Sequence, residues 1–494
     1  MEDEHAKRAH SLMRREFPRA SRTEDVSAII VGGGVAGLSA AWWLNRTGRK
    51  DFFLLELDEK PGGNSSWGEN SVSPYPWGAH YLPFPGENAI YVRTLLEELG
   101  AIKGYRNGRP IYDEWMICRD PQERLYFRGQ WQEGIVPEAG LTATERAEMT
   151  RFMSTMKGMQ SARGNDGRRA FSIPVDLSSK DPAYRLLDDM SMADYLKKNH
   201  YQSEVVSWYA NYCCRDDYGL TSEKTSAWAG IHYFGSRGGE AANAKSDSVL
   251  TWQAGNGWLI ESLKKGVQER IRSNHLVFDI TKSGSGHSVF AFDFQTNQTI
   301  VFRTRAVIYA APAFTTGHVI SQMPRRPAPA YSPWLVANIT LDREPGGPGA
   351  SLSWDNVSYY SKSLGYVVAT HQASRGTPGP TVITYYLPLT AGDAGLMRKE
   401  SATKSNSAWV DEIVTDLSRN HPGIEDTIVE VRTRLIGHGM PQPVPGFIWG
   451  QDRQKMLRPW ENVFFAHSDM SGISIFEEAQ YRGVEAARQA ISIL

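Results

Sequence analysis

An apolar strand that leads into a glycine-rich turn and then into a run of small residues constrains this chain more than any other feature. Ala28–Val31 has the pattern of a buried strand, and Gly32, Gly34 and Gly37 follow it with Gly-x-Gly-x-x-Gly spacing. In such a turn the first glycine permits the tight bend, the second lets the backbone approach a phosphate, and the third lets a helix pack closely on the strand. The helix predicted from Val35 to Thr47, with Ala36 in its first turn, would then direct free N–H groups at a dinucleotide diphosphate.

A second predicted strand, Asp51–Glu56, ends in the acid that such a unit needs. Glu56 lies 19 residues after Gly37, at the spacing where a carboxylate accepts hydrogen bonds from a ribose 2′-hydroxyl. A 2′-phosphate would meet a like charge there. We therefore expect Glu56, with Leu57 beside it, to bind a ribose of a dinucleotide without a 2′-phosphate.

Two further segments are predicted to line the same cofactor. The loop at 61–65 contains Gly62-Gly63, where the backbone can approach a diphosphate, followed by Asn64 and Ser65, whose side chains can donate hydrogen bonds. The aromatic turn at 75–83 suits a chain that passes along a flat ring. The candidates in this turn are Trp77, Gly78, Ala79 and His80.

The composition is that of an ordinary globular chain of 494 residues, with 41% hydrophobic and 22% charged residues. The net charge of −1 gives no field that would attract nucleic acid or an anionic membrane. The three cysteines and the scattered histidines show no metal-ligand spacing, so no metal site is predicted. The apolar window at 26–44 contains the glycine cluster, which would break a membrane span. We expect a soluble cytoplasmic protein, or an exported one if a signal was removed from its start.

The middle of the chain mixes helical and strand patterns. The end of the chain, like its beginning, has an apolar strand that leads through a turn into a helix. An apolar strand at 462–466 leads to Ser468 and Asp469, and a helix is predicted from Ile475 to Ser492, with Phe476 in its first turn. We expect Asp469 to bind sugar-like hydroxyls and the helix start to stabilise negative charge on a bound ring. The other predicted helices are 88–99, several within 142–233, 258–272 and 407–420, and the other predicted strands are 276–281, 288–293, 299–302, 306–310 and several within 334–389.

Taken in chain order, these motifs resemble the flavin amine oxidase superfamily, which includes monoamine and polyamine oxidases, protoporphyrinogen oxidase and phytoene desaturases. The resemblance covers nearly the whole chain and implies FAD as the cofactor. It implies an α/β fold, in which a Rossmann-like FAD-binding domain of the Gly-x-Gly-x-x-Gly type carries an inserted mixed α+β substrate domain. The motifs are the Gly32–Gly37 loop, Glu56, Gly62-Gly63, the Gly78–His80 turn, the strand Val307–Pro312 and the block from Phe464 to Ala479.

The resemblance also implies domain boundaries and further contacts with FAD. An N-terminal arm would occupy 1–24, a discontinuous FAD-binding domain 25–115, 245–320 and 455–494, and a substrate-binding domain 116–244 and 321–454. Asp469 would meet the ribityl chain or its phosphate, and Val277 would lie over the adenine. The remaining residues expected beside the cofactor are Ala310, Pro312, Ser468, Ile475 and Phe476.

The implied reaction moves a hydride from a substrate C–H to flavin N5, with reoxidation by O₂ or another acceptor. The small-molecule substrate would first of all be an amine, oxidised at CH–NH. Three departures from the family weaken that choice, because Asn64 replaces an arginine, Asn338 replaces a lysine near flavin N5, and Ile475 replaces a cage tyrosine. The alternatives are a FAD-dependent desaturase or isomerase of an apolar, isoprenoid-like substrate, and a ligand-binding flavoprotein without turnover. The chain has no second dinucleotide fingerprint, which disfavours an NADPH-dependent monooxygenase.

The candidate catalytic residues are His80, Tyr81 and Asn338. The triplet Arg215-Asp216-Asp217 is either an ammonium-binding group in an aromatic cavity or a solvated helix end with an internal ion pair. His467 either contributes to the site or caps the last turn. His438, Trp252 and Trp449 are candidates for the pocket lining, although core packing would explain them equally. The sequence leaves the oligomeric state open.

Overall fold

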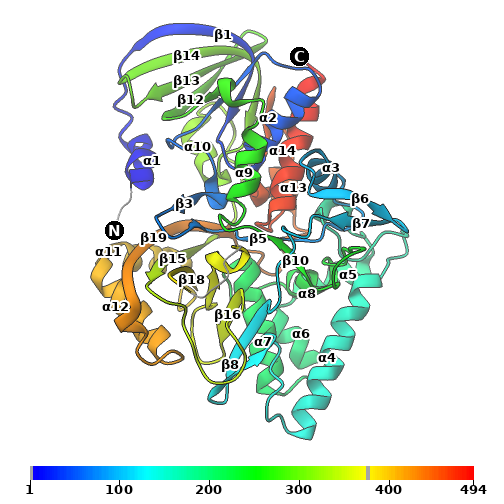
Figure 1. Cartoon of the computed structure of the whole chain (residues 1–494). Coiled ribbons are helices and arrows are strands. Elements are labelled where there is room, and N and C mark those ends of the chain that lie inside the picture. Colours follow the sequence, from blue (N-terminus) through cyan, green and yellow to red (C-terminus); the bar gives the residue numbers. More distant parts are fainter. Residues whose placement is uncertain (1–3, 374–378) are drawn as a thin grey trace. The chain divides into compact units, whose positions relative to one another are not determined.

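The computed structural model describes residues 4–373 and 379–494, and the contacts within it divide the chain into two units (Figure 1). We call the first the Rossmann-like unit; it comprises the described residues up to Ser66, together with Gly257–Pro329 and Trp449–Leu494. The second, the insert unit, comprises Trp67–Asn256 and the described part of Ala330–Ile448. Each unit is therefore assembled from segments that are far apart in the sequence.

The Rossmann-like unit contains a seven-stranded sheet in which a parallel part meets an antiparallel meander. Its order is β11-β2-β1-β14-β13-β12, with β20 also paired to β14. The predicted first strand pairs in parallel with β2 on one side and with β14 on the other. Its strands are β1 (Ala20–Val31), β2 (Phe52–Leu55), β11 (Ile271–Arg272), β12 (His275–Ser283), β13 (Gly286–Asp293), β14 (Gln298–Tyr309) and β20 (Val463–Phe465). Its helices are α1 (Glu4–Arg14), α2 (Val35–Arg46), α9 (Gly257–Lys264), α10 (Thr316–Val319), α13 (Gln451–Met456) and α14 (Phe476–Ile491).

Glycines set how closely α2 packs on its neighbours. A Cβ atom at Gly37 would lie 1.8 Å from the Gly32 carbonyl oxygen, so the helix can reach the strand end only without one. A Cβ atom at Gly483 of α14 would lie 2.1 Å from the Ala36 carbonyl oxygen, and α14 indeed lies beside α2 (Figure 1). The role predicted for the third glycine of the motif is therefore seen directly in the packing.

Several predicted elements differ from those observed in this unit. The N-terminal arm contains helix α1, and residues from Ala20 onward already belong to β1 because they pair with β14. The helix expected at 258–272 ends at Lys264, since Gly266 adopts φ +81° and the chain then joins the sheet as β11. The two strands expected at 299–302 and 306–310 form one continuous strand, β14.

The insert unit is built on a second seven-stranded sheet, with the order β19-β15-β18-β17-β16-β8-β9. Its core cluster includes Leu335, Ile339, Ile383 and Ile413, all fully buried, and extends to helix α12. The strands of the unit are β3 (Trp67–Glu69), β4 (Pro74–Pro76), β5 (Tyr81–Pro83), β6 (Ile102–Arg106), β7 (Arg109–Tyr112), β8 (Glu123–Phe127), β9 (Gln130–Glu133), β10 (Val249–Thr251), β15 (Tyr331–Leu341), β16 (Asp355–Ser358), β17 (Tyr366–Val368), β18 (Thr381–Pro388) and β19 (Ile428–Pro441). The helices are α3 (Ile90–Glu98), α4 (Ala143–Ser161), α5 (Pro182–Arg185), α6 (Met192–Lys198), α7 (Glu204–Tyr218), α8 (Ala227–Gly235), α11 (Ala394–Thr403) and α12 (Asn406–Ser418).

Local pairing explains why the unit boundaries differ from those expected. Residues 67–115 and 245–256, which we expected in the FAD-binding domain, belong by their contacts to the insert unit. Strand β5 pairs with β10, and β4 packs against β18 of the large insert sheet. The aromatic turn at 75–83 is therefore part of the insert unit. In the described residues, no helix is both long and apolar enough to cross a membrane.

Candidate functional site

The two glycine loops predicted to approach a diphosphate meet in the Rossmann-like unit. Gly32 adopts φ +100° and Gly63 adopts φ +55°, which are left-handed conformations that favour glycine. A Cβ atom at Gly63 would lie 3.2 Å from Gly34 Cα, so the loops are in contact. A Cβ atom at Gly34 would have no neighbour closer than 3.9 Å, so the backbone of this residue borders open space.

The N-terminus of α2 offers hydrogen-bond donors that no described residue accepts. Gly34 occupies the N-cap position without a side-chain cap, and no acidic residue lies in the first turn. The backbone N–H groups of Val35, Ala36 and Gly37 have no acceptor within the described part of the chain, although all three residues are buried. Buried donors of this kind require a partner. A dinucleotide diphosphate fits this cradle, with the helix dipole favouring its charge.

Glu56 is held in place behind this loop. Its Oε2 accepts a hydrogen bond from the Gly33 N–H (2.5 Å), and its Oε1 accepts one from the Asp58 N–H (2.8 Å). Burial raises the pKa of Glu56 to about 7, while these backbone hydrogen bonds oppose the rise and the charge of Asp58 adds to it. Each carboxylate oxygen keeps a further lone pair that a ribose hydroxyl can use.

Asp469 connects the two other segments predicted to lie beside the cofactor. The residue is fully buried, and its Oδ2 accepts a hydrogen bond from the backbone N–H of Ala313, directly after Pro312 (2.8 Å). His467 Nδ1 lies 2.9 Å from Asp469 Oδ1 and 3.2 Å from the Asp469 backbone nitrogen. His467 thus caps the short 3₁₀ turn that follows it, which is one of the two roles considered for this residue from the sequence.

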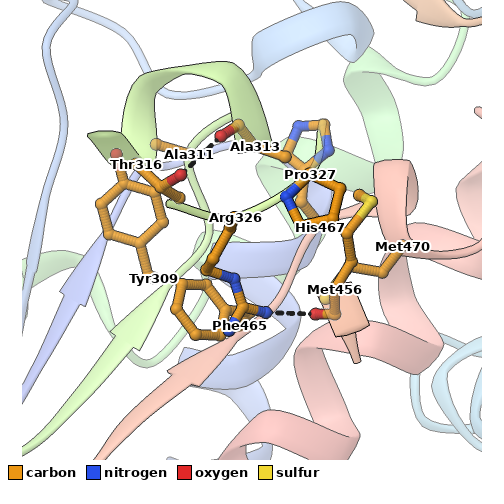
Figure 2. A pocket seen from close by; sticks show the side chains of 10 residues that line it. All are labelled: Tyr309, Ala311, Ala313, Thr316, Arg326, Pro327, Met456, Phe465, His467 and Met470. Atoms are coloured by element: carbon orange, nitrogen blue, oxygen red, sulfur yellow. Dashed lines mark hydrogen bonds between the residues drawn. The ribbon is translucent and has the colours of Figure 1, made fainter. Parts of the chain in front are cut away.

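A small cavity lies beside these residues, at the carboxyl ends of β14 and β20 (Figure 2). Arg326 lies across it, with its guanidinium carbon 3.7 Å from the centroid of the Phe465 ring. Arg326 donates hydrogen bonds to the backbone oxygens of Met456 (2.5 Å) and Arg458 (2.7 Å), and burial lowers its pKa to about 10. The lining residues are Tyr309, Ala311, Ala313, Thr316, Arg326, Pro327, Met456, Phe465, His467 and Met470. Sequence reasoning did not identify this cavity, because its lining comes from four separate segments.

In the insert unit, His80 and Tyr81 belong to an aromatic cluster. The His80 ring stacks on Tyr386 with a centroid distance of 4.8 Å, and it lies 5.1 Å from Tyr81 and 5.5 Å from Trp354. Tyr386 also fixes the turn by donating a hydrogen bond from its hydroxyl to the Gly78 carbonyl oxygen (2.8 Å). Burial lowers the pKa of His80 to about 4, so its imidazole is neutral at pH 7.

Asn338 is hydrogen-bonded to the same turn. Its Nδ2 donates to the Pro76 carbonyl oxygen (3.1 Å), and its Oδ1 accepts from the Thr384 hydroxyl (2.7 Å). The side chain is buried, and both ends of the amide are engaged. Asn338 thus links β15, β18 and the aromatic turn. Its amide is neutral and neither gains nor loses a proton near pH 7. Its predicted catalytic role remains a prediction.

Arg215 and Asp217 of the triplet are buried in helix α7 and Asp216 is partly buried, so the triplet is not a fully solvated helix end. Arg215 and Asp217 are 7% and 6% exposed. Asp217 pairs with Arg237 at 2.5 Å, and Arg215 donates to the Lys362 carbonyl oxygen (2.7 Å). Asp216 forms neither of these pairs, and burial raises its pKa to about 7, with the charge of Asp217 adding to the effect.

Asp216 shares its surroundings with Asp355. Burial raises the pKa of Asp355 well above its usual range, and the charges of Glu123 and Asp216 raise it further. Glu123 stands directly opposite Asp355 in the parallel pairing of β8 and β16. After burial, the charges of Asp355 and Asp216 are also what raises the pKa of Tyr386. The structure therefore brings these carboxylates to the aromatic cluster, and the sequence offered no signal for Asp355, Trp354 or Tyr386.

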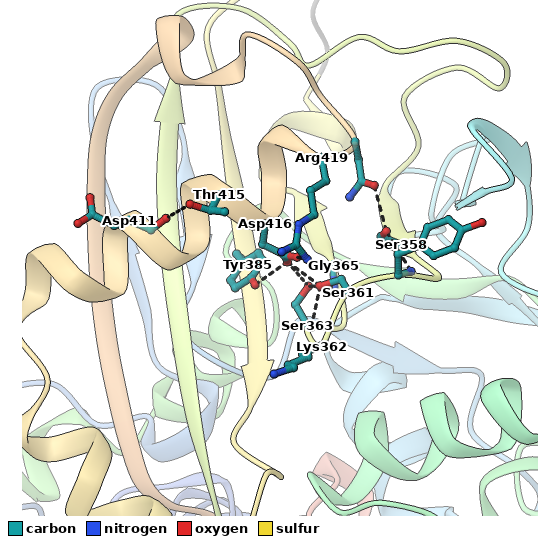
Figure 3. Close-up of polar contacts among 12 residues, drawn as sticks. Ser358, Ser361, Lys362, Ser363, Gly365, Tyr385, Asp411, Thr415, Asp416 and Arg419 are labelled. Atoms are coloured by element: carbon teal, nitrogen blue, oxygen red, sulfur yellow. Dashed lines mark hydrogen bonds and ion pairs between the residues drawn. The ribbon is translucent and has the colours of Figure 1, made fainter.

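Another acidic residue of the insert unit, Asp416, is hydrogen-bonded to several side chains of the protein (Figure 3). Its Oδ2 accepts hydrogen bonds from the hydroxyls of Ser361 (2.5 Å), Tyr385 (2.8 Å) and Ser363 (3.1 Å), and Arg419 lies 3.8 Å from its Oδ1. This carboxylate is occupied by the protein itself, so Asp416 holds β18 to helix α12. Among the described residues, no group of three or more His, Cys, Asp or Glu side chains is arranged to hold a metal ion.

The predicted cofactor residues divide between the units. The turn residues Trp77, Gly78, Ala79 and His80 lie in the insert unit, and all the others lie in the Rossmann-like unit. Ile475 precedes α14 as its N-cap residue, and Val277 is buried in β12. His438 packs with its ring 5.6 Å from Tyr331. The predicted roles of all these residues remain predictions.

Comparison with known proteins agrees with this architecture. The family described as NAD(P)-binding Rossmann-like domain matches residues 30–99. A Baeyer–Villiger monooxygenase from Penicillium patulum is 30% identical over 129 residues, which are 26% of this chain and 19% of that protein. The chain therefore matches only about a fifth of the length of this relative.

Solved structures match over almost the whole chain. Putrescine oxidase bound to putrescine has a TM-score of 0.68 at 16% identity, covering 95% of this chain and 100% of that one. A CLA-producing fatty acid isomerase from P. acnes has a TM-score of 0.61 at 15% identity, covering 93% and 97%. The chain has the fold of these proteins, which confirms the predicted fold class and, at the level of the fold, the resemblance to the flavin amine oxidase superfamily. Among the matched proteins, the Penicillium protein is named a monooxygenase and putrescine oxidase an oxidase.

Proposed function

We propose that the protein is an FAD-dependent oxidoreductase that oxidises an amine at its CH–NH group. The observation that carries the choice of an amine is the pair of partly buried carboxylates with raised pKa values, Asp216 and Asp355, against the aromatic cluster of the insert unit. Without a partner, burial and mutual repulsion keep protons on these groups. An ammonium group of a substrate would reverse this balance, and aromatic faces beside it add cation–π attraction.

The Rossmann-like unit would hold the cofactor. The N–H groups at the start of α2 would bind the diphosphate, Glu56 would accept the adenosine ribose hydroxyls, and Asp469 would face the ribityl chain. FAD, when bound, supplies the hydride acceptor at its N5 atom. The chain's own residues supply binding, orientation and the exclusion of water.

The insert unit would prepare the substrate. An amine reacts only in its neutral form, because hydride loss from the neighbouring carbon needs the nitrogen lone pair. With a pKa of about 7, an oxygen of Asp216 is matched to hold the proton that the ammonium group gives up. The substrate loses a hydride and becomes an iminium ion, which water hydrolyses to a carbonyl compound and free amine. The two electrons then pass to O₂ or another acceptor.

An anaerobic titration tests this function directly. The flavin absorbance of the purified protein is followed while monoamines, diamines, amino acids and isoprenoids are added without O₂. We expect bleaching by an amine, and we expect Asp216→Asn to abolish it while the control Asp411→Asn, on an exposed surface of helix α12, has no effect. Bleaching by an isoprenoid alone would favour the desaturase or isomerase alternative, and reduction by NADPH alone would favour a monooxygenase.

A further inference from the structure

Helix α1 is tied by polar side chains to the loops that flank Glu56. Arg8 Nη1 donates to Asn274 Oδ1 (2.7 Å) and to the Leu57 carbonyl oxygen (3.3 Å). His5 Nδ1 lies 2.8 Å and 2.9 Å from the two carboxylate oxygens of Asp58. Arg8 thus spans from the segment after β2 to the segment before β12.

These two segments are the ones predicted to hold the adenosine half of the cofactor. The Asn274 N–H donates to the Asp58 carbonyl oxygen (3.0 Å), and the His275 N–H donates to the Glu56 carbonyl oxygen (2.7 Å). Glu56, the predicted ribose ligand, therefore sits in a short stretch of chain whose backbone is bonded to the start of β12. Arg8 adds a side-chain bridge across the same junction.

Apolar and aromatic contacts seat α1 on the sheet, so the bridge is not an isolated surface contact. Leu12 packs against the buried cluster of the Rossmann-like unit. The Arg8 guanidinium lies 5.1 Å from the centroid of the Phe294 ring. Just after the helix, Phe17 stacks on Phe278 of β12 with a centroid distance of 4.2 Å. The N-terminal half of the helix is thus held to the loop around Asp58, and the segment that follows the helix is held to β12, the strand that carries Val277.

We propose that α1 is a clamp on the adenosine subsite, with Arg8 as a positioning residue that fixes the Glu56–Asp58 loop against β12. A ligand that meets a loop already in its bound position loses less conformational entropy on binding, so the clamp raises nucleotide affinity. The proposal rests on the proposed function in one respect, namely that the nucleotide is FAD. It assigns a binding role to residues that lie before the glycine-rich loop and outside its motif.

The test uses the apoprotein and two ligands, FAD and ADP, with ADP as a probe of the adenosine subsite. The variants are Arg8→Ala, Arg8→Lys, and the control Arg14→Ala, which removes an exposed arginine from the last turn of the same helix. We expect the Kd of both ligands to rise about fivefold in Arg8→Ala, as for the loss of one hydrogen bond of average strength. Arg8→Lys should recover part of the affinity through a single donor, and Arg14→Ala should behave as the unmodified protein.

The outcomes separate the clamp from a merely structural helix. An Arg8→Ala protein that melts at a lower temperature but binds ADP and FAD with unchanged Kd overturns the proposal. An equal loss of affinity in Arg14→Ala overturns it as well. If the unmodified apoprotein binds neither ligand, the proposed function fails, and this result is distinct from unchanged binding in Arg8→Ala.

Discussion

Replacing Glu56 by glutamine should remove a specific pH dependence from the stability of the apoprotein. Burial raises the pKa of Glu56 from its usual 4.5 to about 7. Between these values the folded state retains a proton that the unfolded state has lost, so this group stabilises the fold at low pH and its contribution is lost as pH rises toward 7. Each pKa unit corresponds to about 1.4 kcal/mol, which gives about 3 kcal/mol for the whole range.

Urea denaturation of the apoprotein and of Glu56→Gln at pH 5 and pH 8 measures this contribution. Other acids with raised pKa values, such as Asp216, titrate in both proteins, so the difference between the two stabilities isolates Glu56. We expect that difference to change by about 2.5 kcal/mol between the two pH values, in the direction that favours the unmodified protein at pH 5. The glutamine side chain accepts one backbone hydrogen bond fewer than the carboxylate of Glu56, and this loss lowers the stability of the variant by the same amount at both pH values. A difference that stays constant with pH would refute the reasoning.

The same argument predicts the pH dependence of cofactor binding. Ribose hydroxyls that donate to Glu56 favour its ionised form, so FAD binding should weaken below pH 7, by up to about tenfold for each pH unit. Flavin fluorescence quenching of the apoprotein between pH 5 and pH 8 gives the Kd. In Glu56→Gln this dependence should vanish, and a parallel dependence in both proteins would contradict a role for Glu56 in ribose binding.

Three other predictions test the remaining parts of the site. Gly37→Ala places a Cβ atom 1.8 Å from a backbone oxygen and should destabilise the Rossmann-like unit. Gly34→Ala places a Cβ atom with no neighbour closer than 3.9 Å, so the melting temperature of the apoprotein should not change. The Gly34→Ala protein should nevertheless lose FAD, which the ratio of flavin to protein absorbance reports. Asp416→Ala strands three hydroxyl donors and should lower the free energy of unfolding by about 2–4 kcal/mol without changing the KM for substrate; a raised KM would place Asp416 in the site. Since the pKa of Asp216 is about 7, the Kd for an amine, measured from the change in the flavin spectrum on anaerobic binding, should fall as pH rises toward 7, and Asp216→Asn should remove that component.

Local sequence was sufficient for the parts of the site that are built from one continuous segment. The strand, the glycine turn and the start of α2 lie within residues 28–46, and the spacing to Glu56 is fixed by one helix and one strand. The glycine requirements at Gly32 and Gly37 follow from backbone geometry alone, and the structure shows both. The C-terminal block was found for the same reason, because strand β20, Asp469 and helix α14 are consecutive.

The aromatic cluster and its carboxylates could be predicted only in part in this way, because these residues are separated by long stretches of chain. His80, Asp216, Asp355 and Tyr386 come from four elements that only the insert sheet and helix α7 bring together. The sequence suggested that the triplet containing Asp216 either binds a cation or is solvated, and burial decided against solvation. The sequence placed the first boundary after residue 115, whereas the contacts divide the chain after Ser66, because β4 packs against β18 and Tyr386 donates a hydrogen bond to Gly78 of the aromatic turn.

The sequence by itself thus determined the Rossmann-like βαβ unit. Two apolar strand patterns, joined by a helical pattern that begins at three spaced glycines, leave this segment few other ways to fold. Tertiary structure alone decided the ionisation of Glu56 and Asp216, since both depend on burial by residues from distant segments. It also decided that α1 reaches the side of the sheet where we propose the adenosine subsite and where Arg8 meets Asn274 across 266 positions of sequence. The pKa values of these acids and the contacts between segments far apart in the sequence arise from tertiary packing, which no local sequence pattern encodes.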